Sequence, residues 1–158
     1  PVRVILRATG HDALYRESLT DLDIADVVTL EPGVPYREAL QEMLKADGLL
    51  IFQSSGCNHQ IPAKAYEYLR AGRPILSLTD SAGDTAQLLQ RNGQSAMADL
   101  LDKDDIKSAI RAFVPGLGAS DGSADTDVSR YSRRGQTAHL AALFDELSGK
   151  GGASETTQ

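Results

Sequence analysis

Residues 56–76 read Gly-Cys-Asn-His-Gln-Ile-Pro-Ala-Lys-Ala-Tyr-Glu-Tyr-Leu-Arg-Ala-Gly-Arg-Pro-Ile-Leu. The apolar run 49–52 before this stretch predicts a buried strand, and a second apolar strand begins at Pro74. Between the two strands, Pro62 suits the first turn of a helix, and Gly72 has the backbone freedom that a helix end requires. Strand, loop, helix and strand within about thirty residues indicate a βαβ unit.

The loop between strand and helix in such a unit lies at the carboxyl end of the sheet, where ligands bind. The helix that follows offers free backbone N–H groups to an anion such as a phosphate. Lys64 adds a positive charge in the first turn, and Glu67 adds a carboxylate one turn later. Two interpretations are open for this pair, because side chains at this spacing either contact a ligand or form a solvated ion pair.

The rest of the chain repeats the alternation of strand and helix. Further strands are predicted at residues 2–6, 25–30 and, weakly, 95–98, and the strand around Pro74 spans 73–79. Helices are predicted to start near Asp12, Pro35, Asp84 and Asp102. This order predicts an α/β, Rossmann-like fold with a mostly parallel sheet and helices on both faces. We expect one domain over residues 1–114, a loop or linker at 115–127, a C-terminal helix at 128–149 and a disordered tail at 150–158.

Composition limits the class of protein. The chain has 158 residues, a net charge of -6 and a hydrophobic fraction of 41%, as soluble globular proteins do. It has no basic field for nucleic acid, so any bound phosphate is held by a local site. The only cysteine, Cys57, is expected to be a small, partly buried side chain, and it fits a reducing compartment. No apolar run approaches the roughly 18 residues of a membrane span, and no signal peptide is visible.

Three features in order carry a resemblance to a known family. They are Val-Val-Thr-Leu at 27–30 followed by Pro-Tyr-Arg-Glu-Ala-Leu at 35–40, then Ala-Asp-Gly-Leu-Leu-Ile at 46–51, then the run 61–76. Together they resemble the carboxyl-terminal half of GT-B glycosyltransferases of the group 1 (family 4) type, which transfer a sugar from a nucleotide diphosphate donor with retention. The resemblance covers roughly residues 2–147, and only the run from Pro62 to Pro74 is specific on its own.

The resemblance implies roles for several residues. In this family the carboxyl-terminal half is Rossmann-like and binds the donor nucleotide, while a separate amino-terminal half binds the acceptor. By position Glu67 would hold the ribose hydroxyls, and a carboxylate suits that role because it accepts both hydrogens of a cis diol. The loop 56–61, which includes Asn58, would face the diphosphate and sugar, and the loop 31–36, which includes Tyr36, would border the nucleobase. The family needs no metal or other cofactor, since the nucleotide sugar is a co-substrate.

The chain departs from the family pattern in two places. Members usually carry another glutamate eight positions before the ribose glutamate, and here that position is His59. His59 is therefore the candidate for the catalytic contact with the donor sugar, and an exposed loop histidine is the alternative. The family's half-domain also begins with an extra strand, a glycine-containing loop and a helix that bears an arginine and a lysine for the diphosphate. This chain starts after them.

The second departure predicts a sheet without its first strand-helix unit and its central strand. It also predicts the loss of much of the phosphate site and of the acceptor side, so we expect the isolated chain to be inactive as a transferase. Association of two copies through exposed sheet edges, as a homodimer, is one way to complete the sheet.

Further candidates lie at the same expected edge of the sheet. Gly10 ends the first strand and either borders a ligand or serves only a tight turn. The triplet Gly83, Asp84 and Thr85 begins the helix after the fourth strand, where its N–H groups would meet a phosphate, or where Asp84 or Ser81 caps the helix. Lys64 contacts a phosphate or is a plain surface charge.

A metal site is not expected, because the spacing of the histidines and the cysteine matches no ligand pattern. No Gly-x-Gly-x-x-Gly follows a strand, which argues against binding of NAD.

The leading hypothesis is thus a donor-binding domain of a retaining glycosyltransferase, of the hexosyltransferase type, in polysaccharide or glycoconjugate synthesis. Its partners would be a nucleotide-sugar donor and a missing N-terminal acceptor-binding domain. We expect a cytoplasmic location, with membrane association through that missing half. The alternative is a non-catalytic Rossmann-like nucleotide-binding or regulatory module.

Overall fold

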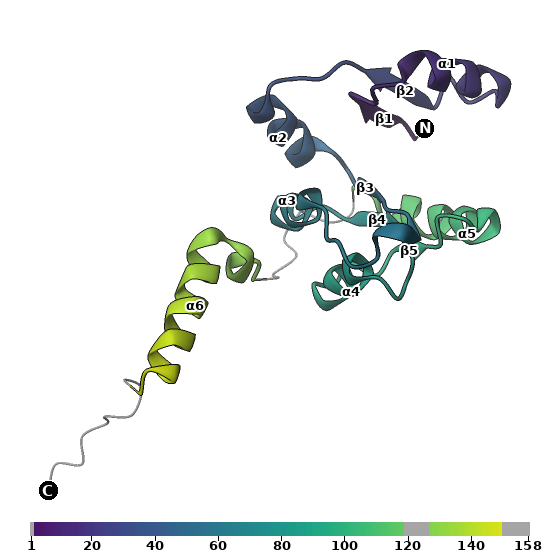
Figure 1. Ribbon diagram of the computed structural model, residues 1–158. Helices are drawn as coiled ribbons and strands as arrows, with labels where there is room; N and C mark the ends of the chain where they lie inside the picture. The colour runs from purple at the N-terminus through teal and green to yellow at the C-terminus, as the bar shows by residue number, and fades with distance from the viewer. Residues whose placement is uncertain (1, 119–126, 150–158) are drawn as a thin grey trace, which may run out of the picture.

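The computed structural model describes residues 2–118 and 127–149. In this part of the chain all paired strands are parallel, and they form two sheets instead of one. The first sheet pairs β1 (Val4–Arg7) with β2 (Val28–Glu31), and the second has the order β3 (Leu49–Phe52), β4 (Ile75–Leu78), β5 (Met97–Ala98). The protein has an α/β, Rossmann-like fold, as predicted, but its sheet is split between β1 and β3 (Figure 1).

Six helices alternate with the strands in the described residues. They are α1 (Asp12–Asp21), α2 (Tyr36–Lys45), α3 (Ala63–Ala71), α4 (Asp84–Arg91), α5 (Lys103–Phe113) and α6 (Arg133–Leu147), with short 3-10 turns at Ser55–Cys57, Val114–Gly116 and Ser129–Tyr131. Pro62 lies just before the first turn of α3, and Gly72 ends this helix in the left-handed conformation with φ 67°, as the sequence predicts. Asp102 caps α5 by accepting hydrogen bonds from the N–H groups of Asp104 and Asp105.

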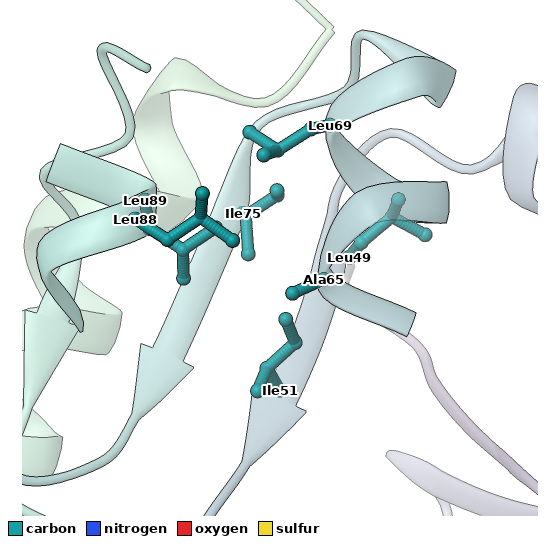
Figure 2. Packing of buried hydrophobic residues seen from close by; sticks show 7 residues of the cluster. All are labelled: Leu49, Ile51, Ala65, Leu69, Ile75, Leu88 and Leu89. Carbon is teal, nitrogen blue, oxygen red and sulfur yellow. The ribbon is translucent and has the colours of Figure 1, made fainter. Parts of the chain in front are cut away.

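The main hydrophobic core covers both faces of the β3–β4–β5 sheet. Figure 2 shows one face, where α3 and α4 pack on β3 and β4 through Leu49, Ile51, Ala65, Leu69, Ile75, Leu88 and Leu89. On the other face Leu76, Leu78 and Ala98 meet side chains of α5. All four residues of β4 are buried, because this strand has a neighbour on each side and helices above and below.

The β1–β2 sheet is covered much less. No residue of either strand is fully buried, and α1 buries none of its side chains. Its connection to the rest is α2, where the Arg7 guanidinium donates two hydrogen bonds of 2.7 Å each to the Glu42 carboxylate. Figure 1 shows β1, β2 and α1 standing apart at one end of α2.

Hydrogen bonds and a ring contact attach the turn Ser129–Tyr131 to α3 and to the end of α4. The Asn92 side chain is buried and donates to the Leu88 carbonyl at 2.7 Å and to the Tyr131 hydroxyl at 2.9 Å. The Tyr131 ring lies 5.4 Å from that of Tyr66. After this turn, α6 points away from the sheets (Figure 1).

The boundaries of the C-terminal region differ from the prediction. The helix expected over residues 128–149 begins only at Arg133, because residues 129–131 form a 3-10 turn and the Ser132 side chain caps α6. Most of the expected linker 115–127 and the expected disordered tail at 150–158 lie outside the described residues. None of the described helices is long and apolar enough to cross a membrane.

Candidate functional site

The loops that follow β3 and β4 meet at the carboxyl end of the sheet. Gln53, the first residue after β3, is only 9% exposed. Its side-chain amide donates to the Cys57 carbonyl at 2.8 Å and also to the Gln60 carbonyl. A buried side chain therefore shapes the loop between β3 and α3, which is the loop that the sequence predicts to face a ligand.

Asn58 ties this loop to the one after β4. Its side-chain N–H group donates to the Asp80 carboxylate at 2.7 Å, and its backbone carbonyl accepts from the Asp84 N–H at 2.8 Å. The Thr85 hydroxyl donates to the Gln60 carbonyl at 3.2 Å. The structure thus brings together three predicted site residues: Asn58 from the loop before α3, and Asp84 and Thr85 from the start of α4.

Gly83 lies in a tightly packed position at this junction. A Cβ atom there would lie 3.1 Å from the Asn58 side-chain oxygen and 3.2 Å from the Asp80 carbonyl. Gly83 is itself the residue at the start of α4, and no side chain caps this helix. Capping by Asp84 or Ser81, the alternative interpretation, is therefore wrong.

Three buried oxygen atoms near this junction have no hydrogen-bond partner among the described residues: Gln53 Oε1, Asn58 Oδ1 and Thr79 Oγ1. Of the three residues, Gln53 borders a cavity of about 80 Å³, which is lined by Gln53, Ser54, Ser55, Asp80, Asp99, Leu100 and Leu101. Buried acceptors need donors, so a ligand hydroxyl or water suits this cavity. The Ala82 N–H and the Asn58 side chain hold the pKa of Asp80 below its ordinary value, so its carboxylate is ionised at neutral pH.

A second contact at this side of the molecule joins α2 to α3. Tyr36 begins α2, and its hydroxyl donates a 3.0 Å hydrogen bond to Glu67 Oε1 in α3. Tyr36 as a whole remains 66% exposed, and the bond to the Glu67 carboxylate raises the pKa of its hydroxyl. The ion pair between Lys64 and Glu67, one of the two interpretations, does not form among the described residues. In its place the carboxylate meets an aromatic hydroxyl from 31 residues earlier.

The remaining predicted residues are not joined to these contacts. His59 and Lys64 are exposed, and within the described part of the chain neither makes a side-chain hydrogen bond or ion pair. Gly10 lies in the separate β1–β2 unit with φ 77° and open space where a side chain would be, so a turn explains it. Cys57 is exposed, contrary to the prediction, because it ends the 3-10 turn on the outside of the loop.

The sequence analysis missed Gln53, Asp80 and Asp99. Each follows closely on the last residue of a strand, after β3, β4 and β5 respectively. That position was a usable signal, because the carboxyl ends of parallel strands share one edge of a sheet. The sequence analysis named residues further along these loops and passed over the polar residues directly after the strands.

In residues 2–118 and 127–149, no group of three histidine, cysteine, aspartate or glutamate side chains is placed to hold a metal ion. Comparison of the chain with protein-family profiles, curated proteins and solved structures finds no match.

Proposed function

We propose that this chain binds the nucleoside diphosphate of a sugar donor, as the donor-binding part of a retaining glycosyltransferase in polysaccharide or glycoconjugate synthesis. The hydrogen bond between Tyr36 and Glu67 carries the proposal. The resemblance assigns these two positions to the nucleobase and the ribose, and the hydrogen bond that joins them supports contact of both with a single nucleoside. An exposed aromatic face offers stacking to a base, and a carboxylate accepts from a cis diol.

The start of α3 supports a diphosphate next to that nucleoside. Pro62 precedes this nine-residue helix, and no side chain caps its first N–H groups. Such groups favour an anion, and Lys64 adds an exposed positive charge in the first turn. His59 lies in the loop just before this helix, where the sugar of the donor would follow the diphosphate. The net charge of -6 makes a local site of this kind necessary for phosphate.

Calorimetric titration with uridine, guanosine and adenosine diphosphates tests the proposal. We expect one of them to bind, and Glu67→Ala to weaken that binding by about tenfold or more, because hydrogen bonds to a charged group are lost. Glu38→Ala removes an exposed carboxylate from the first turn of α2 and is the matched control. Equal affinity in wild type and Glu67→Ala would remove the ribose assignment, and no binding of any of the three nucleotides would remove the proposal.

Two variants of Tyr36 separate its ring from its hydroxyl. Tyr36→Phe keeps the aromatic face and frees Glu67 Oε1, so nucleotide affinity should stay the same or rise. Tyr36→Ala removes the stacking surface and should lower affinity at least about fivefold. A loss of affinity in Tyr36→Phe as large as that in Tyr36→Ala would show that the ring does not stack on the base.

His59→Ala tests the sugar contact with a pair of ligands. We expect the variant to bind the nucleoside diphosphate as well as wild type does, but to bind the corresponding nucleotide sugar more weakly. Equal weakening for both ligands would place His59 at the diphosphate instead of the sugar.

A further inference from the structure

The cavity at the carboxyl ends of β3, β4 and β5 is distinct from the nucleotide contacts proposed above. Its volume is about 80 Å³, and its lining residues come from the segments that follow these strands. Neither Tyr36 nor Glu67 lines it. Because a water molecule takes up about 30 Å³ in the liquid, the cavity has room for a group of about two or three non-hydrogen atoms.

The polar side chains of this lining are mostly acceptors, and two of them are acidic. Asp80 and Asp99 contribute carboxylates, and Ser54 and Ser55 contribute hydroxyl groups. No lysine, arginine or histidine of the described chain lines the cavity, and neither aspartate forms an ion pair within residues 2–118 and 127–149. Hydrogen bonds from a backbone N–H and an amide side chain lower the pKa of Asp80, so its carboxylate is ionised at neutral pH. A cleft lined by charge of one sign concentrates counter-ions, so a cation suits this cavity.

Gln53 supplies a buried acceptor to the same cavity. The residue is only 9% exposed, and its Oε1 atom has no hydrogen-bond partner among the described residues. The nitrogen of the carboxamide donates to the carbonyls of Cys57 and Gln60, and neither of these residues lines the cavity. The nitrogen is therefore turned away from the cavity, and the oxygen lies on the opposite side of the planar carboxamide. A buried acceptor without a donor costs free energy, so a ligand that donates to it is favoured.

These acceptors favour a cation that carries hydrogen atoms. In the part of the chain that the structure describes, no group of three histidine, cysteine, aspartate or glutamate side chains is placed to hold a metal ion. Water or a hydroxyl group satisfies single acceptors but does not balance two carboxylates. An ammonium group has three N–H donors and no acceptor, which matches one amide oxygen and two carboxylates. Its hydrogen bonds to carboxylates are charge-assisted and roughly twice as strong as neutral ones.

We propose that this cavity binds the primary ammonium group of a small amine. The nitrogen donates to Gln53 Oε1 and to the carboxylates of Asp80 and Asp99, and the first carbon atoms contact Leu100 and Leu101, which complete the lining. A bound amine links the segments after β3, β4 and β5. The proposal goes beyond nucleotide binding and does not depend on it.

Titration of the full chain with ethylammonium chloride, followed by NMR in the absence of nucleotide, tests the proposal. A ligand with so few atoms gains little affinity, so we expect half-saturation at about 1–10 mM. The backbone amide signals of Ser54, Ser55 and Leu101, at the cavity, should shift saturably. Those of Val4 and Leu6, in the β1–β2 sheet, should not shift.

Three further titrations separate the features of the ligand. Ethanol has the shape of ethylammonium without its charge, tetramethylammonium chloride has the charge without N–H donors, and potassium chloride supplies a small metal ion at matched ionic strength. Each should give at least about tenfold weaker binding than ethylammonium, because each lacks charge-assisted N–H donors.

Two variants with the same change of charge test the location. Asp99→Asn keeps an oxygen for the Leu101 N–H, which Asp99 Oδ1 accepts at 2.8 Å, but removes a carboxylate from the cavity. It should weaken binding of ethylammonium at least about fivefold. Asp47→Asn is the matched control, since Asp47 is exposed and lies before β3, at the opposite end of the same sheet. It should leave the affinity unchanged, and the amide spectra of both variants report whether they are folded.

Several results would overturn the proposal. They are no saturable shift with ethylammonium, equal binding of ethanol, tetramethylammonium or potassium, and equal weakening by Asp99→Asn and Asp47→Asn. The first means that the cavity holds only water. Equal binding of another ligand means that a hydroxyl group or charge alone is recognised, and equal weakening by the two variants means that the cation is attracted by the net charge of the chain.

Discussion

The two sheets of this molecule are built from similar strands and differ in what covers them. β1 and β4 are both parallel, four-residue and mostly apolar. β4 has a strand on each side and helices on both faces, and all of its residues are buried, whereas no residue of β1 is. An apolar sequence alone therefore does not bury a strand. Burial also needs neighbouring strands on its edges and helices on its faces. Substitutions in the β3–β4–β5 sheet should therefore lower the free energy of unfolding more than substitutions in the β1–β2 sheet.

The largest effect is expected from the core of the β3–β4–β5 sheet. Leu89→Ala removes a fully buried side chain of α4 and should lower the free energy of unfolding by about 2–5 kcal/mol. Leu14→Ala, in α1 beside the β1–β2 sheet, changes a residue that is 61% exposed and should cost less than about 1 kcal/mol. Urea denaturation measures both, and equal costs would contradict the comparison.

Amide exchange in the wild-type chain compares the sheets directly. The N–H groups of Leu76 and Leu78 in β4 should exchange only on global unfolding. Those of Val4 and Leu6, although paired within β1–β2, should exchange through local opening at a free energy at least about 2 kcal/mol lower, because few buried contacts hold that sheet. The same opening energy for both sheets would show that they unfold as one unit.

A smaller effect is expected where the two parts are joined. Arg7→Gln breaks the two-point contact with Glu42 and should lower stability by about 1 kcal/mol. Arg3→Gln is the matched control, since Arg3 lies 3.8 Å from Glu31 at an exposed position and its loss should cost about 0–0.5 kcal/mol. A larger cost for Arg3 than for Arg7 in chemical denaturation would place the important contact elsewhere.

The smallest expected effect is a change in the pKa of Tyr36. Its bond to Glu67 raises the pKa of the phenol, so the folded state holds this proton to higher pH than the unfolded state does. The contribution of the bond is present below the ordinary tyrosine pKa and is lost as pH rises through the raised pKa. Ultraviolet titration of wild type and Glu67→Gln measures the difference. Identical titration of Tyr36 in the two proteins would show that the bond does not form.

Local signals in the sequence predicted most of the elements. Apolar runs located the strands, and the pairing of Pro62 with Gly72 marked both ends of α3. The sequence did not reveal the exact start of α6, because a turn at Ser129–Tyr131 and a cap from Ser132 decide it. The expected lack of a central strand came from the family resemblance. The place where the sheet divides depends on contacts between distant residues that no local pattern contains.

The candidate site was predicted only in part, again because some of its contacts join residues that are distant in the sequence. Asn58 was named from its place in a loop, and Asp84 and Thr85 from the start of a helix; the structure joins these two segments by hydrogen bonds. The bond between Tyr36 and Glu67 crosses 31 residues and was not predicted as a contact. The roles of His59 and Lys64 stay predictions, since their side chains are exposed and a ligand would have to show them.

Gln53 has a consequence for the thermodynamics of binding at this edge. Its buried amide holds the carbonyls of Cys57 and Gln60, so the loop keeps its shape without any bound molecule. A ligand that docks there loses little free energy to the ordering of the loop, because the loop is preorganised. Gln53→Leu should therefore weaken ligand binding through an entropic penalty, visible in calorimetry as a less favourable entropy, although this residue need not touch the ligand.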